Sequence, residues 1–125
     1  MQPFIHEKPI YIQIMDRIKR EIVSKTLVEG SPIASVRELA LQYQVNPNTV
    51  QRALSECERE GYLKSDRTNG RFVSADETMV EELKNKLLTQ WVSELVTQCQ
   101  SIGLDYHSVC ELVKATYEKE GNFND

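Results

Sequence analysis

Four polar side chains near the middle of this sequence have the types and the spacing to read bases in DNA. They are Asn48, Thr49, Gln51 and Arg52, all within residues 46–60. Asn and Gln can pair bidentately with adenine in the major groove, and Arg can pair in the same way with guanine. A polar outer face on a short helix is also typical of ordinary solvent-exposed surface. The surrounding elements must therefore decide whether these side chains contact DNA or only solvent.

The segment that carries these side chains is predicted to be a helix over about residues 46–60. Asn46 followed by Pro47 is a start signal, because Asn caps a helix and Pro suits its first position, and Gly61 is a stop signal. Apolar residues at helical spacing define a face directed toward a core: Val50, Ala53, Leu54 and Cys57. The base readers would lie on or beside the outer face, whereas Asn46 is expected to act as the N-cap rather than to read a base.

A second short helix is predicted directly before it, over about residues 36–43. Ser35 followed by Glu38 matches the capping box that starts a helix. Two short helices separated by a tight break form a helix-turn-helix. Arg37, in the first turn, would be near enough to contact the groove edge or the DNA backbone; alternatively, it would form an ion pair with Glu38 or Glu56.

A β-hairpin is predicted directly after the second short helix, over residues 62–74. The dipeptide Asn-Gly at residues 69–70 is a strong hairpin signal between two strand-like runs. A hairpin in this place is a wing. Arg67, Arg71 and, less directly, Lys64 would then be placed for contact with phosphate or with the minor groove.

An amphipathic helix over about residues 9–26 completes the first domain. Isoleucine recurs on one face at every fourth position, and three neighbours widen this apolar stripe: Ile10, Ile14, Ile18 and Ile22, with Tyr11, Met15 and Val23. The order helix, helix, helix, hairpin describes a winged helix-turn-helix domain, which we expect over residues 1–74. The chain is therefore predicted to be mainly α with a small β-hairpin.

Residues 75–125 are predicted to form a tail of two helices. A cap at Ser74 or Asp76 would start a helix of about 25 residues, which Gly103 ends. Asp105 would cap the last helix. Two helices in so short a segment cannot bury their whole apolar stripe against each other.

A second copy of the chain is the simplest cover for this stripe, because two-fold homodimers are the commonest oligomers. The alternative is that the stripe packs back on the winged helix domain. The residues that we expect in a dimerisation surface are Leu83, Leu87, Trp91, Leu95, Val109, Leu112 and Val113.

The charge of the chain is divided between the two segments. Residues 1–74 carry 11 Lys and Arg against 9 Asp and Glu, a net of +2, and residues 75–125 carry 4 against 10, a net of −6; together these give the overall −4. The basic segment can face phosphate while the acidic segment is held away from it. A bias of +2 permits DNA binding without requiring it.

Several other classes of function find no support in the sequence. Three widely spaced cysteines form neither a disulfide framework nor a zinc pattern, and no catalytic triad, paired carboxylates or phosphate loop is present, so we expect no enzyme, metal or cofactor. No apolar run approaches a bilayer span, and the first ten residues do not follow the pattern of a signal peptide. The expected location is the cytoplasm.

The helix-turn-helix resembles a known family. The segments Ser35-Val36-Arg37-Glu38-Leu39-Ala40, Val45-Asn46-Pro47-Asn48-Thr49-Val50 and Glu58-Arg59-Glu60-Gly61-Tyr62-Leu63 are similar to the GntR family of bacterial regulators. The second segment and the short two-helix tail resemble the YtrA subfamily in particular. Two departures are visible: Ile33-Ala34 stands where the family has Leu-Pro, and Thr68 replaces the first glycine of the wing.

The resemblance implies a dimeric bacterial repressor that binds double-stranded DNA at a palindromic operator, typically of a transporter operon that includes the regulator's own gene. It also implies which residues contact DNA: Arg37 in the first motif, Asn46, Asn48, Thr49 and Gln51 at the start of the recognition helix, and Arg67, Thr68, Asn69 and Gly70 at the wing tip.

Two further alternatives concern partners other than an operator. A winged helix can serve as a protein-interaction module without touching DNA. The sequence does not indicate a small-molecule effector, although Trp91, Tyr106 or Tyr117 would line a site at a dimer interface or beside the first domain; the other interpretation is that these aromatics are core residues.

Overall fold

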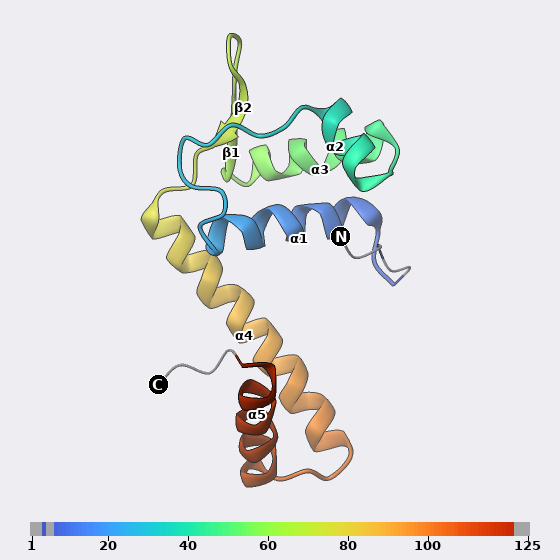
Figure 1. Cartoon of the computed structure of the whole chain (residues 1–125), viewed down its shortest axis with the longest axis vertical. Coiled ribbons are helices and arrows are strands. Elements are labelled where there is room, and N and C mark those ends of the chain that lie inside the picture. Colours follow the sequence, from blue (N-terminus) through green and yellow to red (C-terminus); the bar gives the residue numbers. More distant parts are fainter. Residues whose placement is uncertain (1–3, 5–6, 122–125) are drawn as a thin grey trace. The chain divides into compact units, whose positions relative to one another are not determined.

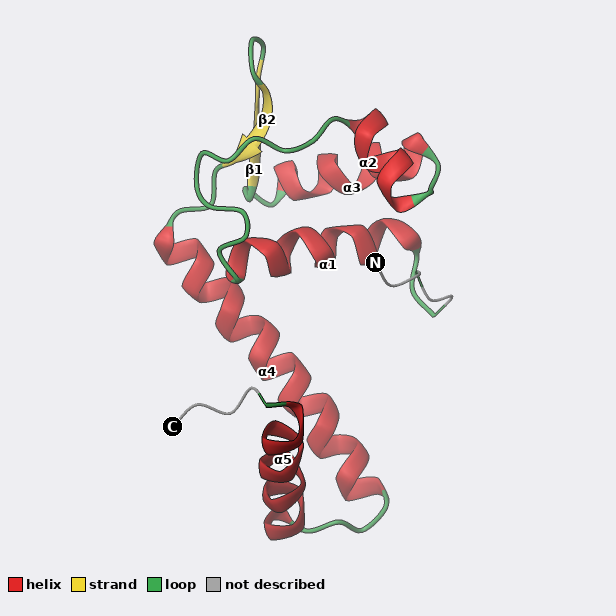
Figure 2. Cartoon of the chain, viewed as in Figure 1, coloured by secondary structure: helices red, strands yellow, loops and turns green. Residues whose placement is uncertain are grey.

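The computed structural model describes Phe4 and residues 7–121, so the first residues of the chain, on which part of the signal-peptide expectation falls, lie outside the described residues. Among the described residues, five helices and one two-stranded antiparallel hairpin follow the predicted order (Figure 2). The elements are α1 (Ile10–Val23), α2 (Val36–Tyr43), α3 (Pro47–Arg59), β1 (Leu63–Asp66), β2 (Gly70–Val73), α4 (Glu77–Ser101) and α5 (Tyr106–Glu120).

The chain divides into two compact units, Met1–Asn85 and Lys86–Asp125. The division falls inside α4, beyond the boundary that we expected after residue 74. Ala75 and Val80 explain the difference, because both belong to the core of the first unit. Each unit is described by itself below.

The first unit is built around α3, which packs against α1, α2 and β1 (Figure 1). Its predicted inward residues are all buried: Val50, Ala53, Leu54 and Cys57. The isoleucines Ile14, Ile18 and Ile22 of α1 are buried with them. Burying an aliphatic side chain of this size stabilises a fold by roughly 1.5–3 kcal/mol, so this core fixes the position of α3.

Both ends of α2 lie at the predicted residues. The Ser35 hydroxyl accepts a hydrogen bond from the Glu38 backbone N–H, and the Glu38 carboxylate accepts one from the Ser35 N–H, which completes the capping box. The α1 prediction was wrong at its end, since α1 ends at Val23 and not near residue 26. Lys25 there adopts a left-handed φ of 69°, and the Leu27 N–H donates to the Glu21 carbonyl.

The hairpin pairs β1 with β2 in the register Leu63↔Val73 to Asp66↔Gly70. Gly70 has a φ of 74°, which suits a three-residue loop closed by a left-handed residue. The loop before α2 also joins β2 at the base of the hairpin, where the Ile33 N–H donates to the Arg71 carbonyl and the Val73 N–H donates to that of Ser31. Backbone bonds on two sides therefore hold the base of the wing.

Leu83 differs from what we expected of a dimerisation residue. It is only 2 % exposed within a single chain and lies in the first unit, so a second copy has almost no surface to cover there. Our assignment of Leu83 to that surface followed helical spacing alone, which does not reveal where along α4 the first unit ends.

The second unit contains the rest of α4 and all of α5. Asp105 caps α5 as predicted, with its carboxylate accepting from the Ser108 N–H. Among the described residues 86–121, none is buried. In the described part of the chain, no helix is long and apolar enough to cross a membrane.

Candidate nucleic-acid interface

The outer face of α3 presents two of the predicted base readers without obstruction. Asn48 and Gln51 are both exposed, on the side of the helix opposite its buried residues. The Gln51 amide donates to the Ser55 hydroxyl over 3.1 Å, a bond that orients the side chain along the helix surface. Exposed amides on the N-terminal half of a helix can reach base edges in a major groove.

The start of α3 is organised by Asn46, as the sequence predicts. Its side-chain oxygen accepts from the Asn48 N–H at 2.8 Å, and Pro47 occupies the first turn. This bond uses the oxygen with which Asn46 would read an adenine, so the residue serves as a cap. Thr49 is half-buried and therefore less available than its neighbours.

Arg52 is held against α1. Its guanidinium carbon lies 3.7 Å from the centre of the Tyr11 ring, within the range of a cation–π contact. The side chain is exposed, yet its stacking fixes it beside Tyr11 rather than at the crest of α3. A base contact by Arg52 would require it to leave this ring.

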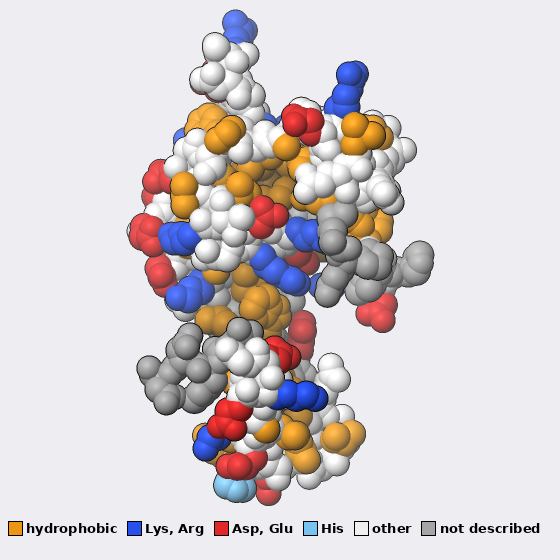
Figure 3. Space-filling model, viewed as in Figure 1, with side chains coloured by type: hydrophobic (Ala, Val, Ile, Leu, Met, Phe, Trp, Pro, Cys, Tyr) orange, Lys and Arg blue, Asp and Glu red, His pale blue; other side chains and the backbone are white. Residues whose placement is uncertain are grey.

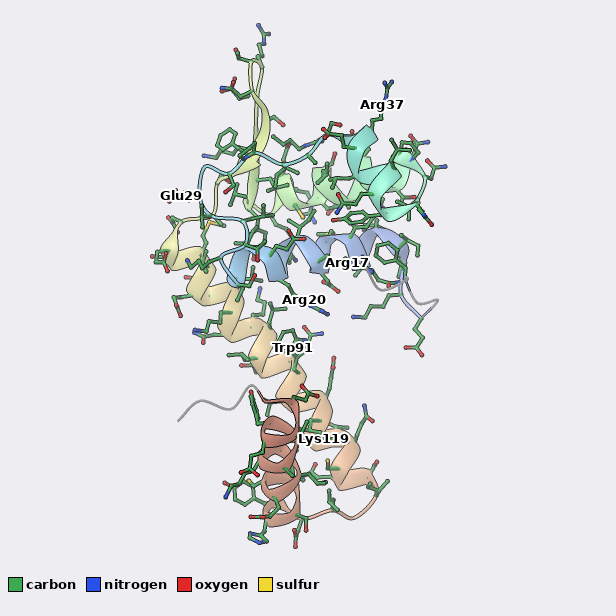
Figure 4. All side chains as sticks on the ribbon, viewed as in Figure 1. Arg17, Arg20, Glu29, Arg37, Trp91 and Lys119 are labelled. Atoms are coloured by element: carbon green, nitrogen blue, oxygen red, sulfur yellow. The ribbon has the colours of Figure 1, made fainter. Side chains whose placement is uncertain are left out.

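Arg37 points away from the body of its unit, as the labelled side chain in Figure 4 shows. Neither of the two ion pairs that we considered for it forms. Glu38 accepts from Ser35 in the capping box, and Glu56 accepts from Arg59 at 2.6 Å. The bond from Ser35 also lowers the pKa of Glu38, which keeps the cap ionised.

The wing tip is exposed and its turn is held by Asp66. That carboxylate accepts from the Thr68 N–H at 2.8 Å and from the Asn69 amide at 3.4 Å. Arg67 and Gly70 at the tip are exposed. The predicted tip residues are thus brought together in one ordered turn.

Arg71 has a different environment from the rest of the wing. It is half-buried, and its Nε donates to Glu58 Oε1 at 2.8 Å. The same oxygen accepts from the Ser65 hydroxyl. These bonds, that of Ser65 first, lower the pKa of Glu58, so the carboxylate is ionised at neutral pH.

The cations of residues 8–74 separate into paired and unpaired groups. Ion pairs or aromatic rings engage Lys8, Arg17, Lys19, Lys25, Arg52, Arg59 and Arg71, and Arg20 is not free either. By contrast, the side chains of Arg37, Lys64 and Arg67 contact no charged or aromatic partner among the described residues. These three lie on α2 and the wing, where Figure 3 shows Lys and Arg side chains projecting into solvent.

A second candidate surface belongs to the unit Lys86–Asp125. Large apolar side chains of this unit are 39–84 % exposed on α4 and α5, and hydrophobic atoms reach the surface there in Figure 3. A groove of about 450 Å³ runs between the two helices. Of the predicted dimerisation residues, Leu95, Val109, Leu112 and Val113 line this groove, while Trp91 is exposed and Leu87 is half-buried outside it.

Comparison with known proteins identifies the class of the helix-turn-helix. The model of bacterial regulatory proteins of the gntR family matches residues 10–73. The uncharacterized HTH-type transcriptional regulator YhcF of Bacillus subtilis is 41 % identical over 115 residues, which cover 92 % of this chain and 95 % of YhcF. The chain belongs to the GntR family. The HTH-type transcriptional repressor YtrA of Bacillus subtilis is 32 % identical over 85 % of this GntR chain and 82 % of its own length, in agreement with the predicted subfamily.

Solved structures agree with the fold. A GntR family transcriptional regulator from Listeria monocytogenes superposes with a TM-score of 0.82, is 34 % identical, and covers 90 % of this chain and 98 % of its own. The DNA-binding domain of AraR in complex with operator ORE1 gives a TM-score of 0.52 and 25 % identity, over 59 % of this chain and 94 % of that one. The predicted fold class is confirmed, and this GntR protein is a transcriptional regulator with a DNA-binding helix-turn-helix, not an enzyme.

Two partner residues in this GntR interface, Tyr11 and Glu58, were not predicted from the sequence. Tyr11 was assigned to the apolar stripe of the first helix, and Glu58 was noticed only as part of a family motif. Both act across long stretches of chain, on Arg52 and Arg71 respectively. One signal in the sequence could have predicted the second contact. Arg71 follows the predicted hairpin turn, and Glu58 is a carboxylate near the end of the helix that precedes the hairpin.

Proposed function

We propose that this chain is a dimeric repressor of a bacterial operon, acting in the cytoplasm on a palindromic operator. In this proposal α3 enters the major groove, the hairpin β1–β2 is the wing, and the second unit joins two copies. The operon includes the gene of the regulator itself, as the resemblance to the YtrA subfamily implies.

The distribution of unpaired cations is the observation that carries the DNA-binding part of the proposal. Arg37 on α2 and Lys64 and Arg67 on the wing lie on the elements that precede and follow α3, whose Asn48 and Gln51 are exposed, whereas the other cations of residues 8–74 have partners. Phosphate contacts on either side of a base-reading helix would fix its register in the groove. The AraR domain, whose fold this unit shares, was solved with an operator.

The apolar face of the second unit supports the dimer. Leu95, Leu112 and Val113 are 39–57 % exposed, in a unit in which none of the described residues 86–121 is buried. A face of this kind is covered in most soluble proteins by a partner. Palindromic operators match two-fold dimers, because each half-site meets an identical recognition helix.

The DNA-binding part is tested by gel shift with the protein's own upstream region and with genomic fragments that the purified chain selects. A specific fragment should bind about 10³-fold more tightly than scrambled DNA.

Two variants separate base contacts from phosphate contacts. Gln51→Ala should weaken the binding free energy by about 1–3 kcal/mol and relax specificity at one position, whereas Arg67→Gln should reduce the slope of log affinity against log salt by about 0.9 for each phosphate that it no longer neutralises. Lys25→Gln, which removes a cation paired with Glu77, is the control and should leave both quantities unchanged. Equal affinity for selected and scrambled DNA would exclude the proposal.

The dimer is tested by sedimentation of the full chain at micromolar concentration. The wild type should sediment as a dimer. Leu95→Lys should shift it to monomer because a charge replaces an apolar contact, and the matched control Gln90→Lys, at an exposed polar position of the same helix, should not. A monomeric wild type, or a Leu95→Lys variant that remains dimeric, would contradict this surface.

A further inference from the structure

One carboxylate oxygen connects the recognition helix to both strands of the wing. Glu58 Oε1, on α3, accepts from the Ser65 hydroxyl on β1 and from Arg71 Nε on β2. Ser65 and Arg71 are directly opposite each other in the hairpin. Glu58 therefore binds a cross-strand pair, and a tilt or a sliding of either strand would break one of its bonds.

The other side of the hairpin is already held by backbone. The Arg71 carbonyl accepts from the Ile33 N–H of the loop before α2. Arg71 is thus fixed at its carbonyl by that loop and at its guanidinium by α3. The Glu58 and Arg71 side chains are only 29 % and 19 % exposed, which places this pair among the more sheltered ion pairs of the described residues.

We propose that Glu58 is the positioning residue of the wing, and that Arg71 acts on DNA binding through Glu58 rather than by touching phosphate. This inference rests on the proposed DNA binding. Bonds to a half-sheltered carboxylate fix the hairpin at the angle from which Arg67 and Lys64 reach the DNA backbone. Arg71, which the sequence placed among the DNA contacts, is engaged in holding that angle.

If Glu58 acted only through its negative charge, its removal would change DNA affinity in the opposite direction from the loss of a positioning residue. A negative charge on the recognition helix repels phosphate and competes for Arg71, so its removal should tighten DNA binding if Arg71 were a phosphate contact. If Glu58 positions the wing, its removal should weaken binding, because the wing cations lose their fixed place. The sign of the change separates the two roles.

The experiment measures the affinity of the full chain for a genomic fragment that the wild type selects. Glu58→Ala should weaken binding about five- to tenfold, in line with the loss of a charged hydrogen bond at a partly exposed site. Glu58→Gln, which retains an acceptor oxygen of the same shape, should recover part of the loss. In an Arg71→Gln background, Glu58→Ala should have a smaller further effect, since the bond to Arg71 is already lost and only the bond from Ser65 remains.

Glu56→Ala is the matched control. It removes a carboxylate from the same helix, but its partner Arg59 also lies on α3 and no wing residue contacts it. Its affinity should equal or exceed that of the wild type. Hydrogen exchange without DNA should show faster exchange of wing amides in Glu58→Ala and not in Glu56→Ala.

Equal or tighter binding by Glu58→Ala would overturn the inference, provided that its thermal unfolding matches the wild type. If Glu58→Ala unfolds, the isosteric Glu58→Gln replaces it in the measurement. Weaker DNA binding by Glu58→Gln than by the wild type would support the inference, and equal or tighter binding would overturn it. A wild type that binds no fragment would refute the proposed function instead, and the hydrogen-exchange comparison would still show whether Glu58 fixes the wing.

Discussion

The two compact units are both helical, yet they differ in what they bury. The unit Met1–Asn85 surrounds α3 with a continuous core in which Ile14, Val50 and Ala53 have no exposed surface. In Lys86–Asp125, no described residue is buried, although α5, like α2, begins at a side-chain N-cap. Local signals therefore form helices in both units, while only the first unit encloses its own apolar face. The second has a face that a further molecule must cover.

Thiol chemistry should give the largest contrast between the units. Burial raises the pKa of the Cys57 thiol to about 12, so this cysteine of the first unit is protonated at pH 8 and inaccessible as well. Cys110 of the second unit is exposed. An aromatic disulfide reagent should modify Cys110 readily, and Cys57 on the order of a thousand-fold more slowly, because Cys57 must wait for unfolding. Peptide mapping checks this; comparable modification of both in the folded protein would contradict the buried core.

Truncating one leucine in each unit should lower the free energy of unfolding in both cases, but only the loss in the second unit should depend on protein concentration. Leu54→Ala should lower the free energy of unfolding by about 2–5 kcal/mol at any protein concentration, because Leu54 is 1 % exposed within one chain. Leu112→Ala should have a smaller effect that fades on dilution, since Leu112 is 57 % exposed until a partner covers it. Thermal unfolding at two concentrations a hundredfold apart is the measurement. A concentration-independent loss for Leu112→Ala would mean that its own chain covers it.

Removing a helix cap should change the free energy of unfolding least, and by a similar amount in the two units. Ser35→Ala should lower the free energy of unfolding by about 1 kcal/mol, whereas Ser55→Ala, which removes an exposed hydroxyl that caps no helix, should change it little.

Acid should weaken both caps. Hydrogen bonds from the capped residues lower the pKa of Glu38 in α2 and of Asp105 in α5. Each carboxylate thus stabilises its helix above the ordinary carboxyl pKa, and the contribution is lost as the pH falls through the lowered pKa. Helix content followed by circular dichroism should fall in this acidic range, and less steeply in Asp105→Ala. An identical acid profile in that variant would contradict the role of this cap.

Local chemistry explains which parts of the fold could be predicted. The capping box at Ser35 and the Asn46-Pro47 start are encoded within a few residues, and α2 and α3 begin where these signals stand. The end of α1 was not predictable in this way, because Lys25 adopts a left-handed conformation without being glycine. That conformation depends on the turn around it, where the Leu27 N–H donates to the Glu21 carbonyl.

The candidate site was predictable by position but not by partner. Asn48 and Gln51 are exposed because the apolar face of α3 fixes the opposite side, which periodicity alone reveals. The contacts of Arg52 with Tyr11 and of Arg71 with Glu58 arise only when distant segments meet in the folded domain. Their positions in the sequence predicted both arginines as DNA contacts. They did not reveal that each arginine already has a partner within the domain.

The many internally engaged cations have a consequence for how such a regulator would search a genome. With few free charges per protomer, we expect a weak hold on random DNA, because that hold comes almost entirely from phosphate contacts. Little of the protein would then be retained at the vast excess of wrong sites, and occupancy of the right one would depend on base recognition. A small pool of molecules would then suffice to keep one promoter under control.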